Sequence, residues 1–476
     1  MDDTVLLLAA VRRVVGSKGS RAPTFWRRRP GYVYGQRSTL MTRTSFHSIA
    51  VLCGLLVACG SVEDLGPTPP EEPIGVSVPS SSGLPMTEPA QVGMSSDGLN
   101  RIRPAMQAYV DDGRLAGVMS MVARRGQVVY WDAVGMRDLD AGDQLERDDI
   151  FRIFSMTKPI TSTAIMTLVE EGKVALNDPI SKFVPEFGDT EVLTDEGERV
   201  AVDGPITVQH LLTHTSGLTY GFFGDSPVDR LYNQSGIFFN AQSLEQFARD
   251  IAGLPLLGHP GAVWNYSVST DVLGRIVEVA SGQSFDAFLQ DRIIGPLGME
   301  DTAFQVSGDK LDRFSGNYAT IGGNLRLTDS PVDGQYTRPP AWLSGGGGLT
   351  STGSDYVRFA QMLLNEGELD GVRILSADTV RLMRTNHLPE ALIPIAVGNY
   401  LSPAYGFGLG FAVVVDETAS PEPDNNGVHR WAGAANTFFW IDPETELIGM
   451  VWMQYGEFAA YEIEREFQTL VYEAID

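Results

Sequence analysis

Cysteine and histidine are scarce in this chain, and their scarcity excludes several classes of site. The 476 residues include only two cysteines, Cys53 and Cys59, and both lie in one apolar N-terminal stretch. The rest of the chain therefore has no disulfide framework and no thiolate metal site. The six histidines form no His-Glu-x-x-His pair, so a zinc enzyme is not indicated. The sequence calls for neither a metal nor another cofactor.

Positive charge is also in short supply. The chain has 35 Lys and Arg against 60 Asp and Glu, which gives a formal net charge of -25. Such a balance repels phosphate backbones, so nucleic acid is excluded as a partner. Hydrophobic residues make up 43% and charged residues 20%, which is ordinary globular usage. At roughly 150 residues per domain, the length allows two or three domains.

The N-terminus has the layout of an export signal. Residues 1–58 contain nine Arg or Lys against two Asp. Residues 41–60 have basic Arg43 near their start, an apolar run over 49–57, and small residues around Ala58. This is the pattern of a secretory signal peptide, and the run is too short for the ~20 apolar residues that span a bilayer.

The end of this signal, Leu-Val-Ala-Cys, resembles the lipobox of bacterial lipoproteins. The resemblance implies cleavage before Cys59, acylation of Cys59, and export as a membrane-anchored lipoprotein of the cell envelope. Gly60 is compatible with sorting to the outer membrane, on the periplasmic side. A simple signal peptide with an incidental Cys59 is the alternative.

Two segments flank this signal and stay outside the predicted fold. Residues 1–40 show no helical or strand period, which suggests a start codon placed too far upstream. We therefore treat 1–58 as an N-terminal extension with the signal peptide. Residues 59–89 are rich in Pro, Glu and Ser and are expected to form an extended linker.

Hydrophobic patterns near both ends of the remaining chain predict one antiparallel sheet. Apolar spacings of three and four predict helices over 97–110, with Asp97 as the cap, and over 459–475. Strand-like segments cover 118–123, 128–133, 407–415, 436–441 and 447–454, the first two joined as a hairpin. We expect residues 90–171 and 396–476 to form an α/β domain together.

The middle, residues 172–395, is predicted to be a helical domain inserted into the first, with the functional site between the two. Its helical patterns cover 208–213, 270–280, 285–294 and 354–365. The glycine run 345–348 is expected to let the backbone pass close to another part of the protein. An ordinary flexible turn is the alternative.

Ser155 and Lys158 lie three residues apart where an apolar helical stripe begins. Pro159 is tolerated only in the first turn, so Ser155 should sit at the helix N-terminus, which favours developing negative charge. A serine hydroxyl is a weak nucleophile until a neighbour takes its proton, and a lysine can do so only if burial lowers its pKa from ~10.4. Ser155 is the candidate nucleophile and Lys158 its base. A lysine reaching from the helix to solvent is the alternative.

Other nucleophile arrangements are less well supported. Ser307 and Lys310 also match Ser-x-x-Lys, but their surroundings are loop-like and no helix follows. There is no Gly-x-Ser-x-Gly, which excludes the nucleophile elbow of the α/β-hydrolases. We interpret His214 as a hydrogen-bonded structural histidine rather than as a member of a Ser/His/Asp triad.

Several blocks in order resemble the serine β-lactamase and penicillin-binding-protein-like superfamily over residues 90–476. Besides the Ser-x-x-Lys helix, the blocks are LVEEGKVALNDPISKFVPEF, ITVQHLLTHTSGL, WNYSVSTDVLGRIVEVASG, PLGMEDTAF, SGGGGLTSTGSDYVRFAQMLLNEG and WAGAANTFFWIDPE. The resemblance implies an α+β fold of the β-lactamase/transpeptidase type, an antiparallel sheet flanked by helices with a mostly helical insertion.

The resemblance also implies roles for residues beyond the first motif. Tyr266 matches the tyrosine of the family's Tyr-x-Asn element, with Val268 in place of the Asn. Its implied role is to share protons with Lys158 and Ser155, acting as the base in acylation and activating water in deacylation. A core tyrosine beside Trp264 is the alternative.

Trp431-Ala432-Gly433 stands where the family usually has Lys-Thr-Gly. Trp431 and Gly433 would line the acyl pocket, with Gly433 letting the backbone approach the substrate. The N–H groups of Ser155 and Ala434 would form the oxyanion hole. A buried structural Trp431 is the alternative.

The tryptophan favours one substrate class. It resembles the variant found in family VIII carboxylesterases, whereas the usual lysine pairs with a substrate carboxylate, which a neutral indole cannot do. Arg430 and His429 lie alongside, but Arg430 should alternate away from the site. We therefore expect a serine carboxylesterase for small uncharged esters. The alternatives are a β-lactamase, a D-Ala-D-Ala carboxypeptidase or D-aminopeptidase, and a non-catalytic envelope binding module.

Overall fold

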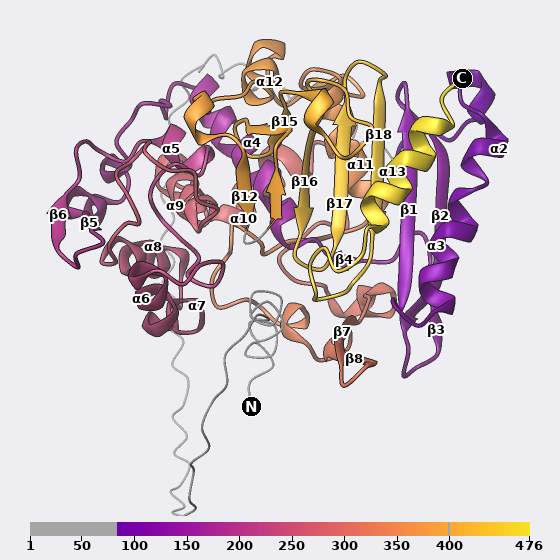
Figure 1. Ribbon diagram of the computed structural model, residues 1–476, viewed down its shortest axis with the longest axis horizontal. Coiled ribbons are helices and arrows are strands. Elements are labelled where there is room, and N and C mark those ends of the chain that lie inside the picture. The colour runs from indigo at the N-terminus through magenta and orange to yellow at the C-terminus, as the bar shows by residue number, and fades with distance from the viewer. Residues whose placement is uncertain (1–82, 398–399) are drawn as a thin grey trace, which may run out of the picture. The chain divides into compact units, whose positions relative to one another are not determined.

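The computed structural model describes residues 83–397 and 400–476 of the chain (Figure 1). The N-terminal extension, the signal with Cys59 and most of the linker lie outside the described residues. Among the described residues, no helix is both long and apolar enough to cross a membrane.

The core of the fold is an eight-stranded antiparallel sheet in the order β14-β15-β16-β17-β18-β1-β2-β3. Its strands are β14 (Tyr405–Phe407), β15 (Ala412–Val414), β16 (His429–Gly433), β17 (Thr437–Asp442), β18 (Leu447–Trp452), β1 (Gly117–Arg124), β2 (Gln127–Asp138) and β3 (Asp143–Gln144). The β1–β2 hairpin pairs with the C-terminal strand β18, so both ends of the predicted domain meet in one sheet (Figure 1). The predicted sheet and hairpin are confirmed.

Helices cover both faces of this sheet. The helices are α2 (Ser96–Leu99), α3 (Ile102–Asp111), α4 (Thr157–Glu170), α5 (Val208–Leu212), α6 (Pro227–Ser235), α7 (Ile237–Asn240), α8 (Leu244–Ala252), α9 (Ser269–Ser281), α10 (Phe285–Leu289), α11 (Gly353–Leu364), α12 (Ala377–Met383) and α13 (Ile463–Glu473). In β1, Val118 and Val122 share a core cluster with α3 and α13, while Met119 and Met121 share one with α4 and α11. Because alternate side chains enter different cores, β1 is buried along its whole length. The predicted α+β fold is confirmed.

Three predicted elements at the chain ends differ in detail. The helix over 97–110 divides into α2 and α3, and its cap is Ser95, whose hydroxyl accepts from the Gly98 N–H, rather than Asp97. The strand over 407–415 is a hairpin of β14 and β15, because the chain reverses at Gly410, where φ is 109°. The final helix begins at Ile463.

The middle of the chain supplies most of the helices together with short strand pairs. The pairs are β4 (Phe151–Arg152) with β9 (Thr350–Ser351), β5 (Glu191–Leu193) with β6 (Arg199–Ala201), β7 (Asn317–Ile321) with β8 (Asn324–Asp329), β10 (Glu368–Leu369) with β11 (Val372–Arg373), and β12 (Ile395–Val397) with β13 (Tyr400–Ser402). The four predicted middle helices appear as α5, α9, α10 and α11, with a π-helical turn over Gln290–Ile294 after α10. Helix α11 packs against β1, β17 and β18, so this segment of the predicted insertion covers the sheet. The domain division itself stays a prediction.

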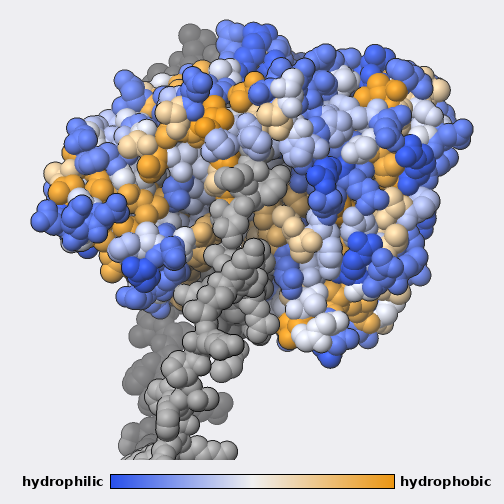
Figure 2. Space-filling model, in the orientation of Figure 1, coloured by the Kyte–Doolittle hydropathy of each residue, from blue (hydrophilic) through white to orange (hydrophobic). Residues whose placement is uncertain are grey.

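The surface agrees with the globular composition. On the face in view, hydrophilic residues predominate, and hydrophobic residues form separate patches (Figure 2).

Packing between the two central strands leads to a stability prediction. A Cβ added at Gly449 in β18 would lie 2.2 Å from ring atoms of Trp440, its partner in β17, which is fully buried. Because such a core cannot relax freely, we expect Gly449→Ala to lower the free energy of unfolding by about 1–3 kcal/mol, measured by urea denaturation. Gly204→Ala, where a Cβ meets open space, is the control. Equal stability of the two variants would contradict this packing.

Candidate active site

Ser155 and Lys158 occupy the start of the central helix α4. A 3-10 turn, η2 (Phe154–Met156), carries Ser155 and runs directly into α4. The Ser155 Oγ lies 3.2 Å from the Lys158 Nζ. Ser155 is partly exposed, whereas Lys158 is completely buried, which rules out a lysine that reaches into solvent. The position of Ser155 at the helix N-terminus is confirmed.

Every donor of the Lys158 ammonium has a partner. Besides Ser155, the Nζ contacts the Tyr220 hydroxyl at 2.9 Å and the Gly346 carbonyl at 2.6 Å. A carbonyl can only accept, and a phenol oxygen can also accept. A neutral amine that donates to these two oxygens therefore has its lone pair left for the Ser155 hydroxyl.

Burial sets the charge of Lys158. Loss of solvent around the Nζ lowers the pKa of Lys158 to about 7, and the negative charge of Asp271 offsets part of this effect. A substantial fraction of the side chain is therefore neutral near pH 7, as a general base for a serine requires.

Tyr266 lies beside this pair but meets Lys158 through its ring. The Nζ is 4.6 Å from the centre of the Tyr266 ring. Burial raises the pKa of Tyr266, and the nearby Ser155 hydroxyl and Trp431 indole N–H counteract part of this rise. The Tyr266 hydroxyl nevertheless has no hydrogen-bond partner among the described residues. The structure thus brings Ser155, Lys158 and Tyr266 together, without a hydrogen bond from Lys158 to Tyr266.

His214 packs against Tyr266 and contacts the residue that follows it, Ser267. Its ring centre is 4.9 Å from that of Tyr266, and its Nδ1 lies 3.3 Å from both the hydroxyl and the backbone nitrogen of Ser267. Burial, with the positive charge of Lys158, holds the pKa of His214 well below its usual value. A neutral His214 that is hydrogen-bonded to Ser267 supports the predicted structural role of this histidine.

Tyr220 is the contact that the sequence did not reveal. It follows α5, and its fully buried hydroxyl takes one of the hydrogen bonds of Lys158. Val268, where the family has an Asn, is buried in the core and offers no polar group. Tyr220 and Lys158 are 62 residues apart in the chain, so no local pattern could indicate their contact.

Strand β16 brings the third element to the site. The Trp431 ring is partly exposed and lies 5.2 Å from the Tyr266 ring, centre to centre. A Cβ on Gly433 would lie 2.3 Å from the Ile153 carbonyl, so this glycine admits the backbone that leads into η2. Ala434 follows at the end of the strand, which packs against η2. Ala434 is therefore near the Ser155 turn, and the oxyanion hole stays a prediction.

Arg430 points away from the site, as predicted from strand alternation. Its guanidinium donates hydrogen bonds to Asp424 and to two residues of α13, Glu464 and Gln468. His429 is buried, and this burial lowers its pKa to about 4. Neither residue therefore supplies a free positive charge beside Trp431.

The glycine run 345–348 packs closely between Lys158 and the start of α9. A Cβ on Gly345 would lie 2.6 Å from the Thr270 carbonyl, and one on Gly346 would lie 2.5 Å from the Asp271 carboxylate. The predicted close approach of backbone is confirmed, and the flexible-turn alternative is wrong. The neighbour at both positions is the start of α9.

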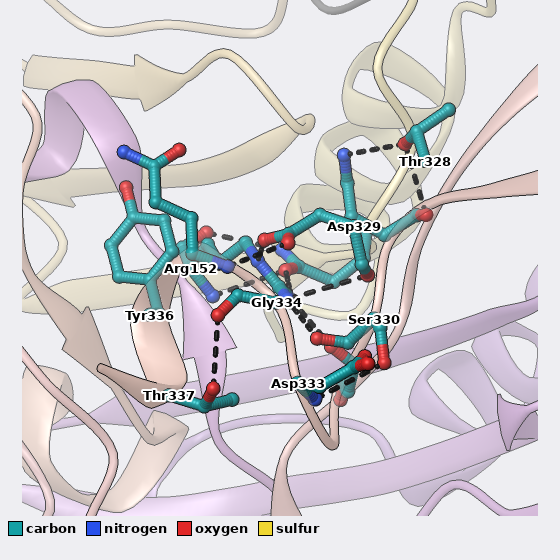
Figure 3. A network of polar contacts seen from close by, with 12 residues as sticks. Arg152, Thr328, Asp329, Ser330, Asp333, Gly334, Tyr336 and Thr337 are labelled. Carbon is teal, nitrogen blue, oxygen red and sulfur yellow. Dashed lines mark hydrogen bonds and ion pairs between the residues drawn. The ribbon is translucent and has the colours of Figure 1, made fainter. Parts of the chain in front are cut away.

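Arg152 anchors the strand that leads to Ser155 (Figure 3). Its fully buried guanidinium donates to Asp329 at 2.6 Å and to the Ser330 carbonyl at 3.2 Å. Its backbone exchanges hydrogen bonds with the Gln454 side chain. These contacts tie β4 to the β7–β8 hairpin and to the end of the sheet.

The second Ser-x-x-Lys lies at the start of an exposed six-residue 3-10 helix, η6 (Gly308–Arg313), so the expectation of a loop with no helix is wrong there. Lys310 pairs with Asp301 at 2.7 Å, while the Ser307 hydroxyl donates to Asp309. In the described part of the chain, no three His, Cys, Asp or Glu side chains lie close enough together to hold a metal ion.

A comparison with protein families decides the relationship. The family model described as Beta-lactamase matches residues 102–472. The chain belongs to the β-lactamase family. The sequence resemblance is thus confirmed, and the fold is the one that its members share.

Relatives within this family include esterases and acyltransferases. The chain is 32% identical to Esterase EstB of Burkholderia gladioli over 370 residues, 72% of this chain and 86% of that protein. It is 28% identical to Monacolin J acid methylbutanoyltransferase of Aspergillus terreus over 359 residues, 69% of this chain and 83% of that protein. Among solved structures, EstCE1, a hydrolase with promiscuous acyltransferase activity, has a TM-score of 0.69 at 27% identity, covering 79% of this chain and 99% of its own. These similarities support a hydrolase.

The contact between Lys158 and Tyr220 leads to a prediction. Tyr220→Phe removes one hydrogen bond from a buried amine, which is worth about 1–1.5 kcal/mol and corresponds to about a tenfold lower kcat/KM for an ester. Tyr232→Phe is the matched control, because the Tyr232 hydroxyl is buried without a hydrogen-bond partner among the described residues. Unchanged kinetics of Tyr220→Phe would mean that this phenol does not orient Lys158.

Proposed function

We propose that this protein is a serine carboxylesterase that hydrolyses small uncharged esters through an acyl-enzyme. The observation that carries the proposal is the contact between a partly exposed Ser155 and a completely buried Lys158. Burial leaves a substantial fraction of the amine neutral near pH 7, and a neutral amine 3.2 Å away can take the serine proton.

The proposed reaction has two halves. In the first, Lys158 takes the proton of Ser155 as its Oγ attacks the ester carbonyl, and the N–H groups of Ser155 and Ala434 receive the negative oxygen. Tyr266, next to Ser155, passes a proton to the alcohol as the ester bond breaks, and the proton held by Lys158 restores the Tyr266 phenol. In the second half, water gives a proton to Lys158 as its oxygen attacks the acyl carbonyl carbon, and the Ser155 Oγ takes that proton back as the acid is released.

The surroundings of Ser155 support an uncharged substrate. Trp431 is partly exposed, and its ring centre lies 5.2 Å from that of Tyr266 and 5.3 Å from that of Phe407. Arg430 is bonded to carboxylates on the other face of the sheet. A substrate carboxylate would therefore meet aromatic rings in place of a cation, which favours an ester over a β-lactam or a D-Ala-D-Ala peptide.

Transfer of the acyl group to an alcohol is a second candidate activity. It is favoured by the similarity to an acyltransferase and to a hydrolase with acyltransferase activity. Adding a primary alcohol to a p-nitrophenyl butyrate assay tests it. Formation of the new butyrate ester supports transfer, and butyric acid as the sole product contradicts it.

Comparison of three substrate types tests the proposed function. We expect p-nitrophenyl butyrate to be hydrolysed faster than nitrocefin or a D-Ala-D-Ala peptide. Ser155→Ala should lower ester turnover by about a thousandfold or more, because the acyl-enzyme cannot form. Faster turnover of the β-lactam or peptide would reverse the assignment, and no turnover of any substrate by a folded protein would favour a binding module.

The charge of Lys158 predicts the pH dependence. Below its pKa of about 7 the amine is protonated and cannot accept the serine proton, so kcat/KM for p-nitrophenyl butyrate should fall as pH drops through about 7. A stopped assay from pH 5 to 9, with a pH-stability control, measures this. A profile that is flat from pH 5 to 7 would contradict a neutral Lys158 as base.

We also propose export and lipid anchoring at Cys59, on the strength of the signal and lipobox pattern. Expression in a bacterium with labelled palmitate tests this. The full chain should incorporate label and fractionate with the envelope, whereas Cys59→Ser should not incorporate label. Equal labelling of both proteins, or of neither, would contradict the proposal.

A further inference from the structure

We propose that Asp271 is a positioning residue that holds Lys158 in place through the Gly346 peptide and serves as its buried counter-charge. The inference rests on the proposed function, because it concerns the base that activates Ser155. It adds a residue outside the Ser155, Lys158 and Tyr266 constellation.

A short chain of hydrogen bonds connects the two charges. One carboxylate oxygen of Asp271 accepts from the Gly346 N–H at 2.9 Å and from the Ser344 hydroxyl at 2.6 Å. The carbonyl of the same glycine accepts from the Lys158 Nζ at 2.6 Å. The carboxylate thus fixes the residue whose oxygen orients the amine, and no direct ion pair forms.

The residues on either side of Gly346 have little freedom to move. The Gly345 carbonyl accepts from the Thr161 hydroxyl at 2.7 Å, on the same helix as Lys158. The Gly347 carbonyl accepts from the Tyr336 hydroxyl at 3.1 Å. Since this loop is bonded to α4 on one side and to Asp271 of α9 on the other, Asp271 sets where the Gly346 oxygen points.

The groups around Lys158 leave Asp271 as its counter-charge. The titratable groups that face the amine are Tyr220, Tyr266, His214 and Asp271. Burial raises the pKa of each phenol and lowers that of the histidine, so these three are neutral near pH 7. The Asp271 carboxylate is also buried, and Lys158 with the two hydrogen bonds counteracts the resulting rise in its pKa.

The two effects on Lys158 have opposite signs. Burial disfavours the ammonium, and the Asp271 charge favours it. The carboxylate therefore keeps the amine able to take a proton near neutral pH. Without it, Lys158 would be a weaker base, since a lower pKa means weaker proton affinity.

Direct titration of Lys158 tests this inference. The chain has only five lysines, so ¹³C labelling at lysine Cε gives a simple NMR spectrum in which Lys158→Arg assigns the resonance. We expect Asp271→Asn to move the Lys158 titration to lower pH by about one unit. Ser344→Ala, which keeps the charge and removes one bond to the same carboxylate, should leave it near the wild-type position.

The acid limb of kcat/KM should move with the NMR titration. Since a folded Asp271→Asn protein is required, Asp271→Ala serves as the second charge-removing variant, with near-ultraviolet circular dichroism as the check on folding. An unmoved Lys158 titration in either folded variant would overturn the inference. Failure of both variants to fold would also overturn it, because the carboxylate would then be a requirement of the fold.

The readout separates this inference from the proposed function. The NMR titration needs no turnover. A shifted Lys158 resonance in a protein that hydrolyses no ester would retain the link to Asp271 and reject the esterase. Ester hydrolysis with an unmoved resonance would do the reverse.

Discussion

The site depends on the burial of one amine. An exposed lysine would be charged at neutral pH and could not take a proton from Ser155, but Lys158 is completely enclosed, which lowers its pKa to about 7. Three contacts make this burial tolerable, to Ser155, Tyr220 and Gly346. Without such partners a buried amine costs several kcal/mol.

The rest of the fold supplies these partners from distant parts of the chain. Ser155 follows strand β4, which Arg152 anchors. Gly433 allows strand β16 to approach the turn that carries Ser155. The helical middle contributes Tyr220, Tyr266 and the glycine run around Gly346. Both ends of the globular chain meet in one sheet, so a residue near 155 and one near 433 can share a site.

Much of this could be predicted where a local pattern carries the information. The strands, the main helices and the placement of Ser155 at a helix N-terminus follow from hydrophobic period and from Pro159. The break in the strand after Phe407 was missed, because its cause is the left-handed conformation at Gly410. The contacts of Tyr220 and Asp271 with the Lys158 neighbourhood are long-range, and no spacing along the chain predicts them.

The most direct test of the account is the rate at which a fluorophosphonate labels Ser155 across pH. Such a reagent requires an activated serine and reports the first half of the reaction alone. In the wild-type protein, peptide mapping should place the label on Ser155, with a rate that rises through about pH 7 as Lys158 loses its proton. Lys158→Met should be labelled slowly at every pH. Equal labelling of the two proteins, or labelling at another serine, would contradict the account.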